Sequence, residues 1–222
     1  IYVSWSGASD SGSGIDGYGL YWSTSATAIP STTKDTSGTS TTSSGLADGT
    51  WYLHVRAVDK AGNWASGALH CGPFKIDTTN PGAPSLTSPD DDGYVSTTRP
   101  TLRWSSAGDS GSGVESYYLH VATDTLGINK VSKFVGNVTS YTLSSSEALD
   151  WGEGYDWKVY AKDKAGNEGP WSTKRTFTVR DTEPPINPDD YSSTPNTNEW
   201  TSGDIYVSWS GASDSGSGID GY

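Results

Sequence analysis

Hydrophobic and polar residues alternate along several short stretches of the chain, and this pattern predicts β-strands with one buried face. The first stretch covers 1–6, where Ile1, Val3 and Trp5 share a face. A second strand is predicted over 18–22, and a last one over Leu69–Ile76. The alternation is strongest within 46–64, where the inward positions are Trp51, Leu53, Val55 and Ala57.

Turn signals separate these predicted strands. The run GASDSGSGIDG at 7–17 is a glycine-rich loop, and DKAGN at 59–63 is a tight turn in which Gly62 and Asn63 tolerate positive φ. Between them, residues 23–45 contain fifteen Ser or Thr in twenty-three positions. Because such a tract buries little apolar surface, we expect it to form an exposed edge strand and loops.

The same pattern returns later in the chain with different residues. LRWSSAGDSGSGVESYYLHV at 102–121 aligns with the first strand, the loop and the second strand, and GYDWKVYAKDKAGN at 154–167 aligns with the later hairpin. The chain therefore holds two homologous domains of about a hundred residues each. The matched pairs are Trp104 with Trp5, Asp109 with Asp10, Glu115 with Asp16, Tyr117 with Tyr18 and Asp163 with Asp59.

A longer stretch of sequence occurs twice, once at each end of the chain. Ile1–Tyr18 and Ile205–Tyr222 are identical over eighteen residues at an offset of 204. We interpret this as a segment of a tandem array with a 204-residue repeat. The predicted domains are 1–78, lacking its first strand, then 79–181, then 182–222 as the linker and first strands of the next copy. In a covalent array, the preceding repeat would supply the missing first strand of the first domain. The alternative is that another molecule of the protein donates that strand.

The predicted joints are short and contain proline. Asp77–Pro89 and Asp181–Asp190 each begin with Asp-Thr and carry no Gly/Ser spacer. Because proline fixes φ and favours extended backbone, we expect neighbouring domains to follow one another in a semi-rigid succession.

Composition supports an all-β fold and limits the partners. The chain has ten Trp and thirteen Tyr, and 14 Lys and Arg against 26 Asp and Glu give a formal charge of −12. An acidic chain without a basic cluster repels phosphate backbones and anionic membranes, so nucleic acid is a poor partner. No run approaches the roughly twenty apolar residues of a membrane span, so we expect no membrane contact in this segment.

The inward tryptophans, the Tyr-bearing next strand, the L-x-x-G-T stretch and the A-V-D-K-A-G-N hairpin resemble fibronectin type III domains and related bacterial or archaeal Ig-like repeats. The resemblance covers nearly the whole chain and implies antiparallel β-sandwiches, two in each repeat. It also implies a tyrosine corner at Leu149 and Tyr155, in which the tyrosine hydroxyl ties down the preceding loop. Trp51 takes this position in the first domain, five residues after Leu46. The same tie is not expected there, because an indole nitrogen can donate but does not have the same reach.

The sequence offers no catalytic motif. His54, His70 and His120 fall at polar strand positions, none beside a plausible nucleophile or in a metal-ligand spacing. We therefore expect no enzymatic activity. The single cysteine, Cys71, excludes a disulfide framework within the repeat, and it is either a small buried thiol or a crosslink to another chain.

The acidic loops suggest a calcium site. In an Ig-type sandwich the loop after the inward-Trp strand and the late hairpin lie at one end, near the linker from the preceding domain. Several carboxylates with hydroxyls and carbonyls there would suit calcium, whereas the alternative is that Asp and Gly only shape the turns. The candidate ligands of such interdomain calcium are Asp77, Asp109, Glu115, Asp163, Asp181, Asp214 and Asp220.

The sequence also offers sites at which sugars could be attached or bound. The Asn137-Val138-Thr139 sequon lies in a predicted loop, and the Ser/Thr tract could carry O-linked sugars. Exposed tryptophans could stack on sugar rings of a bound glycan. The candidates are Trp22, Trp64, Trp151, Trp171 and Trp200.

The sequence thus predicts a structural protein. We expect a repeat segment of a long extracellular or cell-surface fibre or stalk, acting as a semi-rigid spacer or filament building block that contacts neighbouring repeats and assembles laterally or head to tail. The extracellular location is implied by the resemblance, because similar joints and hairpins are frequent in long surface proteins. The alternative is a spacer or glycan-binding module of a surface adhesin or secreted hydrolase.

Overall fold

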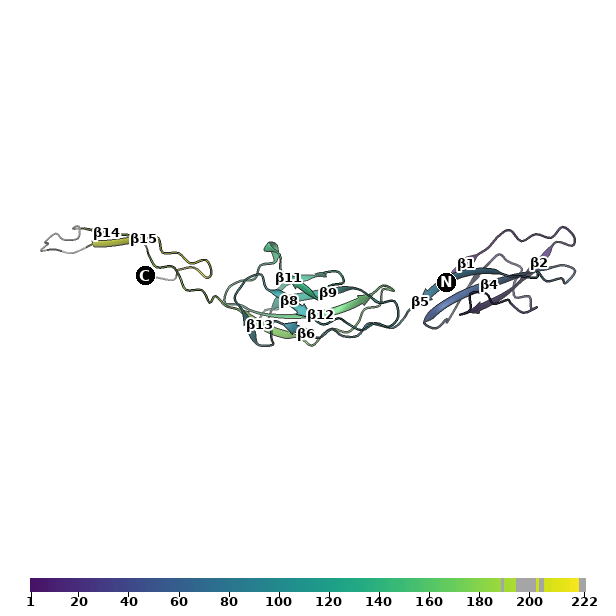
Figure 1. Ribbon diagram of the computed structural model, residues 1–222, viewed down its shortest axis with the longest axis horizontal. Coiled ribbons are helices and arrows are strands. Elements are labelled where there is room, and N and C mark those ends of the chain that lie inside the picture. Colours follow the sequence, from purple (N-terminus) through teal and green to yellow (C-terminus); the bar gives the residue numbers. More distant parts are fainter. Residues whose placement is uncertain (189, 195–202, 204–205, 220–222) are drawn as a thin grey trace. The chain divides into compact units, whose positions relative to one another are not determined.

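The structure is a computed structural model that describes residues 1–188, 190–194, 203 and 206–219 (Figure 1). The chain forms two compact units. Unit 1 comprises Ile1–Pro81 with Asp109–Gly113 and Asp163–Asn167, and unit 2 comprises Gly82–Gly108, Val114–Lys162 and Glu168–Tyr222. The loops that carry Asp109 and Asp163 therefore belong to the same unit as Asp77.

Unit 1 is built from two antiparallel sheets. One pairs β1 with β3, and the other has the order β2-β4-β5. Side chains from both sheets meet in a small core of Trp5, Tyr18, Leu53 and Val55. The strands are β1 (Tyr2–Ser4), β2 (Ile15–Ser23), β3 (Ser40–Thr42), β4 (Gly49–Asp59) and β5 (Leu69–Ile76).

Unit 2 contains a fuller sandwich. A five-stranded sheet with the order β10-β9-β12-β13-β7 faces a three-stranded sheet with the order β11-β8-β6. In β12 every second residue is buried, so Tyr155, Trp157, Val159 and Ala161 enter the core. The elements are β6 (Leu86–Ser88), β7 (Gly93–Val95), β8 (Thr101–Trp104), β9 (Val114–Thr123), β10 (Asn129–Phe134), β11 (Ser140–Thr142), a 3-10 turn (Ser145–Glu147), β12 (Gly154–Asp163) and β13 (Arg175–Val179).

Two further strands of unit 2 form a separate antiparallel pair. β14 (Asp190–Thr194) lies along β15 (Tyr206–Ser210), and Ile186 bridges to Ser213. β15 belongs to the second copy of the duplicated stretch, so its sequence is also that of residues 2–6.

The all-β fold predicted from the sequence is confirmed. The strand predicted over Leu69–Ile76 is β5, and the Ser/Thr tract supplies the short edge strand β3 between loops, as expected. The predicted boundaries at 78 and 181 stay predictions, and parts of 182–222, including Trp200 and Asp220, lie outside the described residues. None of the described residues forms a helix long and apolar enough to span a membrane.

The loop tie at the start of β12 and β4 is present in both units. The Tyr155 hydroxyl accepts the backbone N–H of Asp150 at 2.9 Å, which confirms the expected tyrosine corner. In unit 1 the expectation was wrong, because the Trp51 indole N–H donates to the backbone carbonyl of Ala47 at 2.8 Å. The roles of donor and acceptor are exchanged between the two units. The longer tryptophan ring donates to a backbone carbonyl, whereas the tyrosine hydroxyl accepts a backbone N–H.

Candidate functional site

Asp163 is positioned by the turn that ends β12. In the D-K-A-G-N sequence its backbone N–H donates to the Asn167 carbonyl at 3.0 Å, and its carboxylate accepts the Asn167 backbone and side-chain N–H groups at 2.8 and 2.7 Å. Gly166 takes the positive φ of 98° that closes the turn. Asp59 and Asn63 repeat these contacts at the end of β4, so the identical sequence gives the same turn.

Asp109 lies in the glycine-rich loop before β9. One carboxylate oxygen, Oδ2, accepts the backbone N–H of Gly113. The other, Oδ1, is buried and has no hydrogen-bond partner. A buried carboxylate oxygen without a partner is costly, so this atom calls for a proton, a water or a cation.

Asp77 follows β5 directly and approaches the same loop. Its carboxylate accepts the backbone N–H groups of Ser112 at 2.6 Å and Thr79 at 3.1 Å. Hydrogen bonds from Ser112 and, to a smaller extent, Thr79 lower the pKa of this carboxyl. The carboxylate occupies the space that a side chain at residue 111 would need, which explains the glycine at that position.

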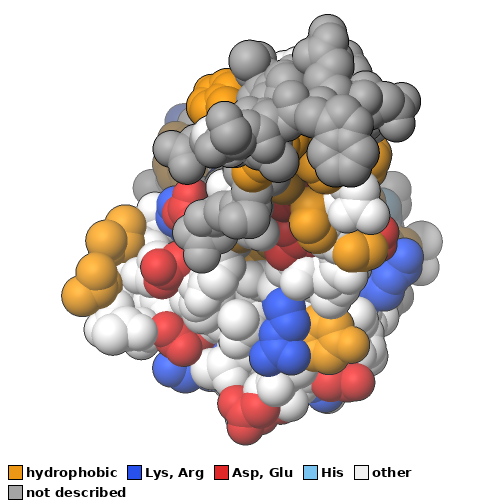
Figure 2. Space-filling model, turned by 90° about the vertical axis from the view of Figure 1, so that its left-hand side faces the viewer, with side chains coloured by type: hydrophobic (Ala, Val, Ile, Leu, Met, Phe, Trp, Pro, Cys, Tyr) orange, Lys and Arg blue, Asp and Glu red, His pale blue; other side chains and the backbone are white. Residues whose placement is uncertain are grey.

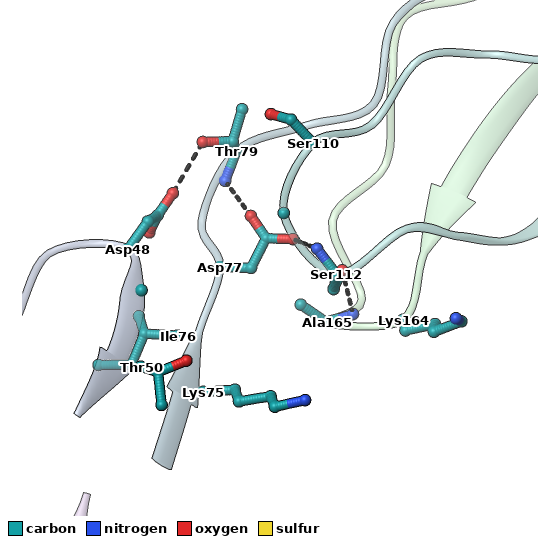
Figure 3. Close-up of a pocket in the computed structure, with 12 residues that line it drawn as sticks. Asp48, Thr50, Lys75, Ile76, Asp77, Thr79, Ser110, Ser112, Lys164 and Ala165 are labelled. Atoms are coloured by element: carbon teal, nitrogen blue, oxygen red, sulfur yellow. Dashed lines mark hydrogen bonds between the residues drawn. The ribbon is translucent and has the colours of Figure 1, made fainter. Parts of the chain in front are cut away.

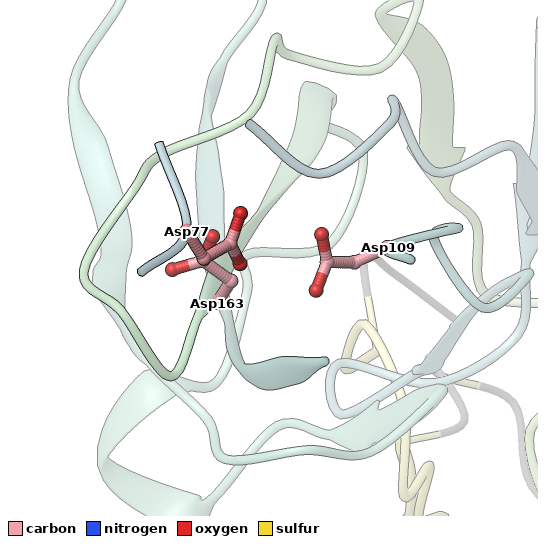
Figure 4. A group of neighbouring side chains, drawn as sticks. All are labelled: Asp77, Asp109 and Asp163. Carbon is pink, nitrogen blue, oxygen red and sulfur yellow. The ribbon is translucent and has the colours of Figure 1, made fainter. Parts of the chain in front are cut away.

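These three carboxylates form one cluster (Figure 4). One oxygen from each of Asp77, Asp109 and Asp163 lies within 4.8 Å of the other two, and Asp163 is fully buried. Carboxylate oxygens are ligands that hard divalent cations prefer, and these three would supply part of the roughly six to eight oxygens that calcium takes. The same oxygens also cap turns, so the hydrogen bonds alone do not require a metal.

An open hollow of about 750 Å³ lies beside the cluster in unit 1 (Figure 3). Asp48 stands on its wall and holds the chain after β5: it accepts the backbone N–H and hydroxyl of Thr78 at 2.9 and 2.8 Å and the hydroxyl of Thr79 at 2.7 Å. Asn167 adds a bond from its side-chain amide to the Asp77 carbonyl at 3.1 Å. Residues 77–79 are therefore fixed by side chains on both sides.

Asp48 and Asn167 were not predicted from the sequence. Asp48 precedes its partners by thirty residues, and Asn167 follows Asp77 by ninety, so no local spacing pointed to either. Asn167 carried one usable signal, because it ends the same D-K-A-G-N motif that supplies Asp163.

The arrangement around Asp77 recurs in unit 2 around Asp181. Ser217 donates its backbone N–H to the Asp181 carboxylate at 2.5 Å, and Asp214 accepts those of Gly216 and Gly218 at 3.2 and 2.7 Å. Hydrogen bonding from Ser217 lowers the pKa of Asp181. Asp181 and Asp214 are thus brought together as predicted, while Asp220 lies outside the described residues.

Glu115 does not join the carboxylate cluster. It is an exposed residue of β9, and the group of Asp77, Asp109 and Asp163 forms without it. Its counterpart Asp16 forms an exposed ion pair with Lys34 at 2.8 Å. A strand residue next to a loop can face away from that loop, which the alignment alone did not indicate.

The histidines correct one expectation. His54 was expected at a polar strand position away from any plausible nucleophile, and it is fully buried. Its Nε2 lies 2.9 Å from the Ser23 hydroxyl, and its Nδ1 lies 2.7 Å from Nδ1 of His70. The register of β4 against β5 places the two rings directly opposite. His54 therefore does lie beside a serine, and burial, with a smaller contribution from His70, lowers its pKa. His120 is half-buried, with Nδ1 at 3.3 Å from the Ser132 hydroxyl.

The tryptophans proposed for sugar stacking have different surroundings. Trp22 and Trp151 pack against the cores of units 1 and 2, and Trp64 lies under the Arg56 guanidinium. Trp171 is 39% exposed and belongs to a cluster of rings on the outer face of the five-stranded sheet of unit 2. We call this set the aromatic cluster: Tyr118, Phe134, Tyr160 and Trp171.

The remaining predicted positions are accessible to different degrees. Asn137 is exposed between β10 and β11, and its side-chain amide donates to the Val114 carbonyl at 3.0 Å. Cys71 is a free, half-buried thiol on β5, and burial raises its pKa. Glycosylation of Asn137 and a crosslink through Cys71 stay predictions.

Comparison with known proteins gives the following likenesses. Residues 90–180 match the family model described as Rha78A-like, N-terminal immunoglobulin domain. No characterised protein sequence matches the chain. Among solved structures, the fibronectin(III)-like modules of Clostridium thermocellum CbhA share 17% identity at a TM-score of 0.37, covering 78% of this chain and 82% of that one.

Two α-L-rhamnosidases are also similar. The enzyme from Dictyoglumus thermophilum shares 16% identity at a TM-score of 0.35, over 59% of this chain and 16% of that one. The enzyme from Streptomyces avermitilis shares 17% identity at 0.33, over 46% and 10%. The chain thus spans only a small part of either rhamnosidase, and what resembles known proteins is an immunoglobulin-like module.

Proposed function

We propose that this chain of immunoglobulin-like modules is a non-catalytic structural segment of an extracellular or cell-surface fibre or stalk, where its modules serve as semi-rigid spacers. The repeated domain pattern supports a role that depends on number and spacing of modules. The matched family model describes an N-terminal immunoglobulin domain. A fold of this kind does not by itself imply a function, because function depends on the particular site that a domain carries.

The observation that carries this proposal is the fixation of residues 77–79. Asp48 takes three hydrogen bonds from Thr78 and Thr79, and Asp77 takes one from Ser112. A slack linker would leave its polar groups to water. A spacer that transmits force or holds a distance needs its connecting residues ordered in this way.

Limited proteolysis tests the proposal. We expect a broad-specificity protease to cut the intact chain slowly at 77–82, and Asp48→Ala to be cut several times faster there because Thr78 and Thr79 lose their acceptor. Asp16→Ala, which removes only an exposed ion pair, is the control and should behave like the unaltered chain. Cleavage of the unaltered chain at the rate of an unstructured peptide would overturn the spacer role.

We further propose that calcium binds the cluster of Asp77, Asp109 and Asp163. The observation in favour is the buried Asp109 Oδ1 without a partner, on a carboxylate that lies close to two others. A bound cation would supply that partner and offset the repulsion of the three charges. The order of residues 77–79 would then depend on the ion.

A second candidate function is glycan binding within an adhesin or secreted hydrolase, and the aromatic cluster favours it. Trp171 and Phe134 remain 39% and 44% exposed, and Lys158 and Lys162 lie over their rings at 4.4 and 5.5 Å. Exposed rings beside polar groups are suited to sugar stacking.

Retention on polysaccharide columns tests this second function. We expect Trp171→Ala to lose retention, whereas Tyr94→Ala should keep it because Tyr94 is an exposed ring outside the cluster. Absence of retention of the unaltered chain across neutral and acidic polysaccharides would dispose of the glycan-binding function.

A further inference from the structure

The aromatic cluster of unit 2 is a compact and partly exposed patch of four rings. Tyr118 and Tyr160, on the neighbouring strands β9 and β12, stack at 5.2 Å with an angle of 14° between the rings. Phe134 and Trp171 each pack nearly at right angles against both tyrosines, at angles between 82° and 84°. Because these two outer rings are themselves exposed, the patch presents apolar surface to the solvent.

The corresponding face of unit 1 is covered by the chain itself. Gly19 takes the position of Tyr118 in the alignment of the two domains. A side chain at residue 19 would meet the backbone oxygen of Thr33 at 2.7 Å and the Trp64 ring at 3.0 Å, so a ring cannot be placed there. The exposed rings are therefore a property of unit 2 that unit 1 does not share.

Two lysines of β12 lie over the exposed rings. The Lys158 amine is 4.4 Å from the Trp171 ring centre, and the Lys162 amine is 5.5 Å from that of Phe134. Both lysines alternate with buried residues of β12 and therefore face outwards together with Tyr160. Neither of them forms an ion pair within the part of the chain that the structure describes. Their charges are thus held at the rings without being offset by a carboxylate.

This face has a local excess of positive charge on an acidic molecule. Asp156 is offset by Lys174, whose amine lies at 3.4 Å, and Glu168 bridges to Lys162 through the backbone. Three lysines therefore face two carboxylates here, although the chain as a whole carries a charge of −12. Elsewhere, over the face of the molecule drawn in Figure 2, acidic and basic side chains are interspersed. Charge complementarity at the aromatic cluster favours an anionic ligand.

We propose that the aromatic cluster and the two lysines over it bind an acidic polysaccharide. The sugar rings would stack on Trp171 and Phe134, and the sugar carboxylates would pair with Lys158 and Lys162. This inference rests on the second candidate function given above, glycan binding, and specifies the class of its ligand.

A neighbouring hollow gives a polymer room to continue past the cluster. Trp171 also lines an open hollow of about 410 Å³ in unit 2. Its charged lining residues are Lys174, Arg175 and Asp91, and Pro84 adds apolar surface. An extended ligand can therefore contact Trp171 from the cluster and from the hollow, so the site suits a chain of several sugar units better than a single sugar.

A matched pair of polymers tests the proposal. Polygalacturonate and its methyl ester have the same sugar ring and linkage and differ in the charge of the carboxyl group. Binding of the 222-residue chain to each polymer is measured by isothermal titration calorimetry at low and high salt. Chelator is present throughout, because a divalent cation could bridge an acidic protein to an acidic polymer. The variants are Trp171→Ala, Lys158→Gln and Lys162→Gln, with Lys60→Gln, at an exposed lysine of unit 1, as the control.

We expect the unaltered chain to bind polygalacturonate at low salt, and to bind the methyl ester about tenfold more weakly because the ion pairs are lost. Lys158→Gln and Lys162→Gln should each weaken polygalacturonate binding by about threefold, and high salt should weaken it further. Trp171→Ala should weaken binding by about tenfold or more, and Lys60→Gln should leave it unchanged. Circular dichroism establishes that the variants are folded; if Trp171→Ala unfolds, Phe134→Ala replaces it.

Four results would overturn the proposal. They are equal binding of both polymers, polygalacturonate binding that survives both lysine changes, absence of binding to either polymer, and self-association of the unaltered chain that Trp171→Ala abolishes. The last result, seen by sedimentation velocity, would assign the face to a second copy of the chain.

Failure of the proposal is distinguishable from failure of the proposed functions. Equal binding of both polymers through Trp171 would leave glycan binding in place and remove only its selectivity for acidic sugars. Absence of retention on every polysaccharide would remove both. None of these results alters the proteolysis result at 77–82, which tests the spacer function separately.

Discussion

At the scale of single residues, the loop ties of the two units show how one position can be filled by different chemistry. Tyr155 accepts an N–H from Asp150, and Trp51 donates an N–H to Ala47. Both bonds fasten the loop that leads into a long central strand of their sheet. The ring at this position therefore serves loop geometry as well as packing.

Removal of these polar ring atoms should destabilise each unit. We predict that Tyr155→Phe costs about 1–2 kcal/mol of unfolding free energy, because the Asp150 N–H loses its acceptor, and that Trp51→Phe costs about the same. Urea denaturation followed by fluorescence measures both. Tyr2→Phe, at a ring that is 70% exposed, is the control and should stay within about 0.5 kcal/mol. A Tyr155→Phe variant as stable as the parent would show that the corner contributes only packing.

Asp109 is the residue through which calcium binding is best tested. We predict that saturating calcium raises the melting temperature of the chain by roughly 5–10 °C over chelator-treated protein, and that Asp109→Asn abolishes the rise. Differential scanning calorimetry with and without chelator measures it. Asp10→Asn, in the same loop sequence but outside the three-carboxylate cluster, should keep the rise. Equal calcium response in both variants would contradict the site.

The buried His54 gives the chain a predicted pH dependence. Its pKa is lowered in the folded state from the ordinary 6.5, so the unfolded chain binds the proton more strongly. Stability from this group is therefore full above about pH 6.5 and is lost as pH falls below it. Half-buried His120 acts in the same direction, because burial also lowers its pKa.

Urea midpoints at about pH 7.5 and 5.5 measure this effect. The midpoint of the unaltered chain should be lower at the acidic value, and His54→Gln should have a smaller difference between the two. An unchanged difference in the variant would assign the pH dependence to other groups.

Among individual site residues, the sequence predicted those that occur within repeated motifs. Asp109, Asp163, Asp181 and Asp214 stand in D-S-G-S-G, D-K-A-G-N or D-T motifs, and the structure brings them into the pairs and the cluster described above. The prediction for Glu115 was wrong, because an alignment does not determine which face of a strand a residue occupies when it lies next to a bulge or loop. The buried oxygen of Asp109 and the pairing of His54 with His70 depend on contacts across the sheet, which no local pattern encodes.

At the scale of elements, period-two alternation located the long strands. β4, β9 and β12 lie in the predicted stretches because their core-facing residues are aromatic, branched or small and repeat at every second position. The short strands were harder to predict, since a three-residue strand such as β7 is defined by its parallel pairing with β13 and not by its own sequence. The edge strand β3 was recovered from composition, because a Ser/Thr tract can pair its backbone but cannot fill a core.

The edges of the sheets also explain why the two copies of one sequence differ. β1 and β15 share their residues, yet Trp5 is 7% exposed in the core that it forms with residues of β2 and β4, while Trp209 is 47% exposed. Burial of a strand residue is thus a property of the whole sandwich.

At the scale of the whole molecule, the main feature is repetition. One pattern of strands, acidic loops and Asp-Thr joints occurs in both units and begins again at residue 205. The function that we propose depends on length and spacing, and under that proposal the hydrogen-bonded residues 77–79 would keep the spacing definite. The immunoglobulin-like sandwich was predictable from the sequence, whereas the contacts made by its sheet edges and aromatic rings were not.

Immunoelectron microscopy of the intact cells that make the protein tests the central claim most directly. With an antibody against the 222-residue chain, we predict labels on fibres or stalks outside the cell, spaced at regular intervals along each of them. Labels confined to the cell interior, or found only on dispersed soluble molecules, would contradict the proposal that the chain is a structural segment of an extracellular assembly.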